Sequence, residues 1–155
     1  MTIPVSQGRM GLLLASSTDG AEATAGGFNA SLRDYGRFGM LLANDGMRDG
    51  VEIIPRDYVL DGTDVSKQPP GFKPRVATPY FGYGYQTWLQ PNKTRTFALQ
   101  GIHGQSMLIQ PANQIVIVQT SANMKPSGQQ DMQPYRYRGA FWAGVLRSLG
   151  GEVGE

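Results

Sequence analysis

The chain contains no cysteine and only one histidine, His103. The absence of cysteine excludes disulfides, thiolate metal sites and a cysteine nucleophile. A single histidine excludes a metal centre built from several histidines. The sequence also lacks a phosphate loop, a dinucleotide-binding fingerprint and a cluster of metal-ligating residues. We therefore predict a protein that carries no cofactor and no metal.

Charged residues are also scarce, at 17% of the 155 residues, and the net charge is only +2. The lysines and arginines are scattered, which does not favour a surface for nucleic acid. The apolar run from Met10 to Ala15 is too short to span a bilayer and fits a signal peptide poorly. We expect a soluble chain that binds neither nucleic acid nor membrane, and its compartment stays unassigned.

The N-terminal part contains one clear helix. Residues 1–28 are rich in Gly, Ala, Ser and Thr without a sustained period, which predicts an extended lead-in. From residue 31 apolar side chains recur at helical spacing, and Ser31 with Asp34 forms a variant of the capping box. The pattern predicts a helix over about 31–44.

A second, short helix is predicted over about 55–61, with Pro55 in its first turn. Together the two helices make residues 29–62 a helical region. Residues 62–79 follow and contain four prolines. This composition predicts a loop long enough to have a function or to move.

The pattern changes after Tyr80, where aromatic and β-favouring residues predominate. The links between the apolar runs are short, which favours antiparallel neighbours over residues 80–121. The predicted strands are one around Tyr83–Thr87, where alternate residues are large, and then 96–100, 106–110 and 115–121.

A last helix is predicted over about 136–149, and we expect Arg136 and Arg138 on its surface. Helices followed by strands and then by a helix indicate the α+β class, with residues 1–155 as a single partial domain. The predicted buried stripe of the last helix consists of Tyr137, Phe141, Trp142, Val145, Leu146 and Leu149.

The segment from Gln100 to Ser106 has the strongest chemical signal. It joins two predicted strands and contains Gly101 and Gly104, which let the backbone come close to a ligand. Backbone N–H groups in such a place can stabilise the oxyanion of acyl transfer. The alternative is that the glycines serve only a tight turn and that His103 is a surface loop residue.

Three blocks of the sequence resemble the serine hydrolases related to class C β-lactamases and penicillin-binding proteins. They are GGFNASLRDYGRFGMLL, GYGYQTWL and GIHGQSMLIQPANQIVIVQTSA. Within this family the chain is most similar to 6-aminohexanoate-dimer hydrolases and related esterases. The resemblance covers residues 24–149, and it implies the C-terminal portion of the β-lactamase/transpeptidase-like fold.

The family uses three motifs: Ser-x-x-Lys for the nucleophile, a Tyr-x-Asn or Ser-x-Asn loop, and a Lys-Thr-Gly-type strand. By the resemblance, Ile102-His103-Gly104 takes the place of Lys-Thr-Gly. Gly104 is then retained, the Gln105 N–H donates to the oxyanion, and His103 lies beside the scissile group. Ile102 replaces a lysine that would hold a ligand carboxylate, which argues against β-lactam substrates.

The other two motifs have no counterpart in these residues. No serine is followed three positions later by lysine, and no Tyr-x-Asn occurs. Ser121-Ala122-Asn123 fits Ser-x-Asn by letter, but it follows Gly104, so we interpret it as the end of the last strand. We expect the nucleophile, its lysine and the tyrosine to lie before residue 1.

Two functions follow from the resemblance. The first is the C-terminal part of a hydrolase that cleaves a small amide or ester through an acyl-serine, with Ile102 and Tyr85 near the substrate. For Tyr85, packing is the alternative role. The second is a non-catalytic module that binds a ligand, the missing N-terminal segment or another copy of the chain.

Overall fold

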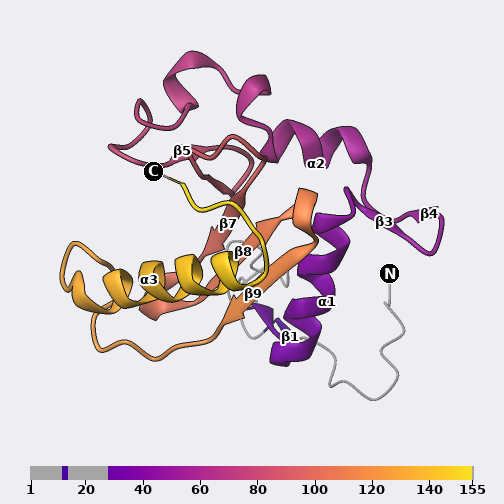
Figure 1. Ribbon diagram of the computed structural model, residues 1–155. Coiled ribbons are helices and arrows are strands. Elements are labelled where there is room, and N and C mark those ends of the chain that lie inside the picture. The colour runs from indigo at the N-terminus through magenta and orange to yellow at the C-terminus, as the bar shows by residue number, and fades with distance from the viewer. Residues whose placement is uncertain (1–11, 14–27, 155) are drawn as a thin grey trace, which may run out of the picture.

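The computed structural model describes residues 12–13 and 28–154, and Figure 1 shows their arrangement. Helices and antiparallel strands are both present, so the predicted α+β class is confirmed. The helices are α1 (Leu32–Ala43), α2 (Arg56–Thr63) and α3 (Gln133–Ser148), and the strands are β1 (Leu12–Leu13), β2 (Phe28–Asn29), β3 (Met47–Arg48), β4 (Val51–Glu52), β5 (Gly82–Tyr83), β6 (Trp88–Leu89), β7 (Phe97–Gln100), β8 (Ser106–Gln110) and β9 (Ile115–Gln119).

The main sheet has five antiparallel strands in the order β5-β6-β7-β8-β9. Neighbours in the sheet are also neighbours in sequence, which is the meander that the short links predicted. In the central pair, Phe97 lies opposite Ile109 and Gln100 opposite Ser106. Two further antiparallel pairs, β1-β2 and β3-β4, lie outside this sheet.

A helix packs on each face of the sheet, and Figure 1 shows α3 lying across β7, β8 and β9. Successive residues of a strand point to opposite faces, so each strand contributes to two cores. Phe97 and Ile109 belong to the cluster that includes Leu42 of α1. Leu108 belongs to the second cluster, with Trp142 of α3. The sheet is therefore buried on both sides.

The predicted helix over 31–44 is confirmed as α1. Ser31 is its N-cap: the Asp34 N–H donates to Ser31 Oγ at 3.2 Å, and Ser31 Oγ donates to the Asp34 carboxylate at 2.6 Å. This is the predicted capping box in its Asp form. At Gly39 an added Cβ would lie 2.4 Å from Val116 Cγ1, so glycine permits the close approach of α1 to β9.

Two predicted boundaries after α1 were shifted. The second helix runs from Arg56 to Thr63 instead of 55–61, and Pro55 is its N-cap. The predicted loop over 62–79 contains two 3₁₀ turns, Val65–Lys67 and Pro70–Phe72.

The predicted single strand around Tyr83–Thr87 was wrong. The structure has a hairpin there, in which β5 and β6 pair antiparallel. Gln86 has a φ of 58°, in the left-handed region, and Gly84 N–H donates to Thr87 O at 2.9 Å, which closes the turn. The alternation of large and small residues therefore reflects a turn and not a continuous strand.

The predicted buried stripe of the last helix is confirmed at Trp142 and Leu146 but wrong at Tyr137, Phe141 and Leu149. Tyr137, Phe141 and Leu149 are exposed, whereas Arg138, Trp142 and Leu146 are buried. These three buried residues lie four apart, so they share one side of α3. The expected surface position of Arg138 was wrong because this side, and not the neighbouring aromatic one, faces the sheet.

The predicted lead-in over 1–28 lies outside the described residues, except for β1 and Phe28 of β2. Among residues 12–13 and 28–154, no helix combines the length and the apolarity needed to cross a membrane.

The C-terminal tail is attached to the β6–β7 loop through Glu152. Its carboxylate accepts from the N–H of Lys93 at 2.7 Å, the N–H of Thr94 at 2.8 Å and the hydroxyl of Thr94 at 2.6 Å. Its main chain exchanges two hydrogen bonds with the buried Gln110 side chain. The hydrogen bond from the Thr94 hydroxyl and those from the two amides lower the pKa of Glu152.

The substitution Glu152→Gln is expected to lower the free energy of unfolding by about 1–2 kcal/mol at neutral pH, since the carboxylate is partly exposed. Because the folded-state pKa lies below the ordinary value, the stabilisation is complete above about pH 4.3 and is lost as the pH falls further. Urea unfolding at pH 7 and pH 3 measures both effects. A difference between wild type and variant that is as large at pH 3 as at pH 7 would contradict this role of the carboxylate.

Candidate functional site

The segment that joins β7 to β8 forms a turn, which we call the Gly101–Gln105 turn. Strand β7 ends at Gln100, Ile102–Gly104 form one 3₁₀ turn, and the Gly101 N–H donates to Gln105 O at 2.9 Å. The tight crossing predicted here is therefore present. The family's Lys-Thr-Gly motif belongs to a strand, whereas Ile102-His103-Gly104 lies in the turn after the strand.

Gly104 occupies a position that only glycine fits well. It is buried and has a φ of 89°, which side chains of L residues rarely adopt. An added Cβ would lie 2.4 Å from Asn123 Nδ2 and 3.0 Å from Ser121 Cβ. The turn is thus packed against the segment that follows β9, which we call the 121–126 loop.

His103 is attached to the 121–126 loop by three hydrogen bonds. Its Nδ1 lies 2.8 Å from Asn123 O, its N–H donates to Pro126 O at 3.0 Å, and its carbonyl accepts from the Asn123 N–H at 3.0 Å. Because a carbonyl oxygen can only accept, Nδ1 is the protonated ring nitrogen. Nε2 is then the ring atom that can still bind a proton or accept a hydrogen bond. The half-buried ring is therefore held in one orientation.

Gln105 pairs with Ser121 in the way that a neighbouring strand would. Its Nε2 donates to Ser121 O, and its Oε1 accepts from the Ser121 N–H at 3.1 Å. The interpretation of Ser121-Ala122-Asn123 as the end of the last strand was wrong, because β9 ends at Gln119. The main-chain N–H and carbonyl of Ser121 bond to the Gln105 side chain instead of to a neighbouring strand.

Two main-chain amides of the turn differ in their partners. The Gln105 N–H, predicted to be an oxyanion donor, lies 3.5 Å from Ile102 O, which is a long hydrogen bond. For the Ile102 N–H we find no acceptor among the described residues. The Ile102 side chain is 67% exposed, so this end of the turn faces outward.

Tyr85, predicted to lie near the substrate, is on the β5–β6 turn. Its ring is 53% exposed and lies 5.4 Å from the ring of Tyr58 in α2. Because Trp88 pairs with Ala98 in antiparallel register, the β5–β6 turn emerges at the same end of the sheet as the Gly101–Gln105 turn. No hydrogen bond or ring contact within the described residues joins Tyr85 to that turn.

None of the serine hydroxyls in the described part of the chain bonds to a histidine or a lysine. Ser31, Ser66, Ser121 and Ser148 bond to Asp34, Asp64, Asn123 and Gly144, and the Ser106 hydroxyl is buried without a partner. Residues 12–13 and 28–154 also hold no group of three acidic or histidine residues that could bind a metal. The described residues thus contain no serine that a histidine or a lysine activates.

Sequence reasoning missed Arg138, which lies behind the turn. Its Nη2 donates to Gln100 Oε1 at 2.7 Å, and Gln100 is the last residue of β7 before the turn. Burial lowers the pKa of Arg138, although a guanidinium stays protonated at neutral pH. The only sign of its burial in the sequence was its spacing of four residues from Trp142. The aromatic residues on the neighbouring side of the helix, Tyr137 and Phe141, favoured the wrong side.

The chain is similar to known proteins over most of its length. A family model described as beta-lactamase matches residues 3–140. Among solved structures, a Bacillus anthracis protein that carries the name 6-aminohexanoate-dimer hydrolase matches with 29% sequence identity and a TM-score of 0.64. The match covers 84% of this chain but 33% of that protein, so the chain spans about a third of its relative. No curated protein matches significantly.

Proposed function

The chain belongs to the beta-lactamase family, and from this premise we propose that it is the C-terminal part of a serine hydrolase that cleaves an amide or ester bond. The reaction would proceed through an acyl-serine, with the nucleophile and its basic partner outside these residues. The chain would contribute one wall of the cleft and a main-chain oxyanion donor. The observation that carries the proposal is the rigid Gly101–Gln105 turn at the end of a central strand.

The geometry of the turn supports an electrostatic role. A preorganised donor stabilises developing charge best when its own surroundings do not rearrange during the reaction. The hydrogen bonds of His103 and Gln105 to the 121–126 loop hold the turn in that way. The donor would be the Gln105 N–H, whose long hydrogen bond to Ile102 O a substrate oxygen can replace, or the outward-facing Ile102 N–H.

The remaining predicted site residues receive supporting roles. His103, with Nε2 free to bind a proton, would lie beside the scissile group. Ile102 and Tyr85 are both largely exposed and would contact the substrate. Because Ile102 cannot pair with a carboxylate, small linear amides and carboxylic esters are favoured over β-lactams.

The rest of the enzyme is the proposed partner. Strand β9 is an edge of the main sheet within the described residues, and an unpaired edge favours pairing with a further strand. Exposed Tyr137 and Phe141 on α3 add apolar surface that a larger fold could cover. A non-catalytic module that binds a ligand or a second copy at this edge is the alternative function.

The proposal is tested by expressing the longest reading frame that contains this sequence and treating the product with a fluorophosphonate. We expect one labelled serine, in a Ser-x-x-Lys motif outside residues 1–155, together with ester hydrolysis that its replacement by alanine abolishes. A frame without that motif, or a product that is neither labelled nor active, would contradict the enzyme and favour the non-catalytic module.

A further inference from the structure

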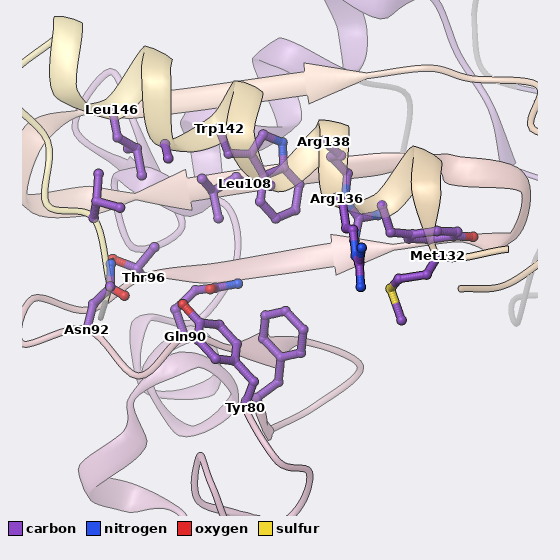
Figure 2. Close-up of a pocket in the computed structure, with 16 residues that line it drawn as sticks. Tyr80, Gln90, Asn92, Thr96, Leu108, Met132, Arg136, Arg138, Trp142 and Leu146 are labelled. Atoms are coloured by element: carbon purple, nitrogen blue, oxygen red, sulfur yellow. The ribbon is translucent and has the colours of Figure 1, made fainter. Parts of the chain in front are cut away.

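A cavity of about 510 Å³ lies between α3 and the sheet. Figure 2 shows Arg138, Trp142 and Leu146 of α3 pointing into it, with Leu108 of β8 on the opposite wall. Trp142, Leu146 and Leu108 are 6%, 4% and 2% exposed, so the chain itself encloses this wall. A space of this volume, with an apolar wall and a few polar groups, suits a small molecule.

The buried polar atoms of the cavity residues that lack a hydrogen-bond partner are mostly donors. Six buried side-chain atoms of the described residues have no hydrogen-bond partner, and five of them belong to residues of this cavity. Four of the five are donors: Arg138 Nε, Arg138 Nη1, Trp142 Nε1 and Gln90 Nε2; the acceptor is Asn92 Oδ1. Buried polar groups are normally paired, so this set favours a ligand that brings acceptors.

The positive charge of Arg138 also lacks a counter-ion. The residue is 8% exposed, its one hydrogen bond is to the neutral Gln100, and its guanidinium carbon lies 4.9 Å and 4.7 Å from the ring centres of Tyr135 and Trp142. No carboxylate of the described residues forms an ion pair with it. A buried cation without an anion is costly, and a bound anion would remove that cost.

A second arginine lies at the edge of the cavity. Arg136 lines it together with Tyr80 and Met132, as Figure 2 shows, and it is exposed and forms no ion pair with any described residue. Two cations without an ion-pair partner among the described residues give this end of the cavity a positive potential, which attracts anions toward the buried guanidinium.

We propose that the cavity between α3 and the sheet binds a small aliphatic carboxylic acid, whose carboxylate pairs with Arg138. The acid's apolar tail lies against Leu108, Trp142 and Leu146, away from the guanidinium. This site is independent of the acyl-transfer chemistry proposed for the Gly101–Gln105 turn, because it needs only residues of this chain. A bound carboxylate would accept the hydrogen bonds that Arg138 does not otherwise make.

The test compares octanoate with octan-1-ol, which has the same tail and no charge, by titration calorimetry of the 155-residue chain. Octanoate is expected to bind at least about tenfold more tightly than the alcohol, since hydrogen bonds to charged groups are the stronger ones. Octanoate should also shift the NMR signal of the Trp142 indole N–H, identified with a Trp142→Phe variant. Equal affinities, or no binding of octanoate, would overturn the proposal.

Two arginine variants of α3 provide the matched comparison. Arg138→Gln is expected to weaken octanoate about tenfold or more while leaving octan-1-ol within about twofold. Arg147→Gln removes the same charge from the last turn of α3, outside the cavity, and should leave both affinities unchanged. Equal losses of octanoate affinity in the two variants would show a non-specific charge effect and contradict the proposal. If Arg138→Gln does not fold, the comparison of acid and alcohol on the wild type decides alone.

Discussion

The purified 155-residue chain is expected to leave p-nitrophenyl esters unhydrolysed above the rate of buffer. A main-chain donor stabilises an oxyanion only after a nucleophile has attacked, and no serine hydroxyl of the described residues is paired with a histidine or a lysine. In serine proteases the loss of the nucleophile lowers kcat by about 10⁶-fold. A spectrophotometric assay of the released nitrophenolate over several hours is sensitive enough to detect residual turnover.

The same sample is then treated with a fluorophosphonate probe, and no serine should be labelled. The longer reading frame that contains the chain is the positive control for both measurements. Hydrolysis by the chain that survives a serine-directed inhibitor would contradict an acyl-serine mechanism. Labelling of a serine within residues 1–155 would place the nucleophile inside the chain and contradict our assignment of it elsewhere.

Replacing Gly104 by alanine is expected to lower the free energy of unfolding by about 2–4 kcal/mol. The new methyl group would have to adopt a φ of 89° and would meet Asn123 Nδ2 at 2.4 Å. The smallest movement that removes this clash is a shift of the 121–126 loop. Such a shift also breaks the hydrogen bond between His103 Nδ1 and Asn123 O. Urea unfolding measures the loss of stability, and the imidazole NMR signals report the change at His103.

Gly101→Ala is the matched control on the same turn. Its φ is −113°, and an added Cβ would lie 3.2 Å from Gln105 Cβ, so it should cost less than about 1 kcal/mol. In a double variant, Asn123→Ala should recover part of the loss at Gly104, because the contacts are shared. Equal costs at Gly101 and Gly104 would show that the packing of the turn against the 121–126 loop is not what requires glycine.

Much of the secondary structure could be predicted because its causes are local. Ser31 and Asp34 cap α1 from three positions apart, and the predicted strand 106–110 matches β8 residue for residue. The predictions failed where one local sequence pattern was compatible with two different structures. The alternating large residues around Tyr85 suit either a strand or a hairpin, and the left-handed Gln86 that decides between them is not a residue type that signals a turn.

The position of the candidate site along the chain could be predicted from the sequence, but the residues that hold it in place could not. The glycines flanking His103 predicted a tight crossing, and the structure has one. The partners that hold it, Asn123 for His103 and Ser121 for Gln105, are 20 and 16 residues away along the chain. No periodicity links such positions, so nothing in the sequence pattern could pair them.

The amino-acid sequence alone determined the α+β class and the place of the glycine turn, because capping, alternation and turn chemistry act over a few residues. The family followed from the resemblance of three sequence blocks to known serine hydrolases. Only the tertiary structure decided which side of α3 is buried. Two neighbouring sides of that helix carry large residues, and the choice depends on what the sheet presents to them. Gln100 at the end of β7 offers an acceptor to Arg138, and that contact places an arginine, instead of the neighbouring Tyr137, in the interior.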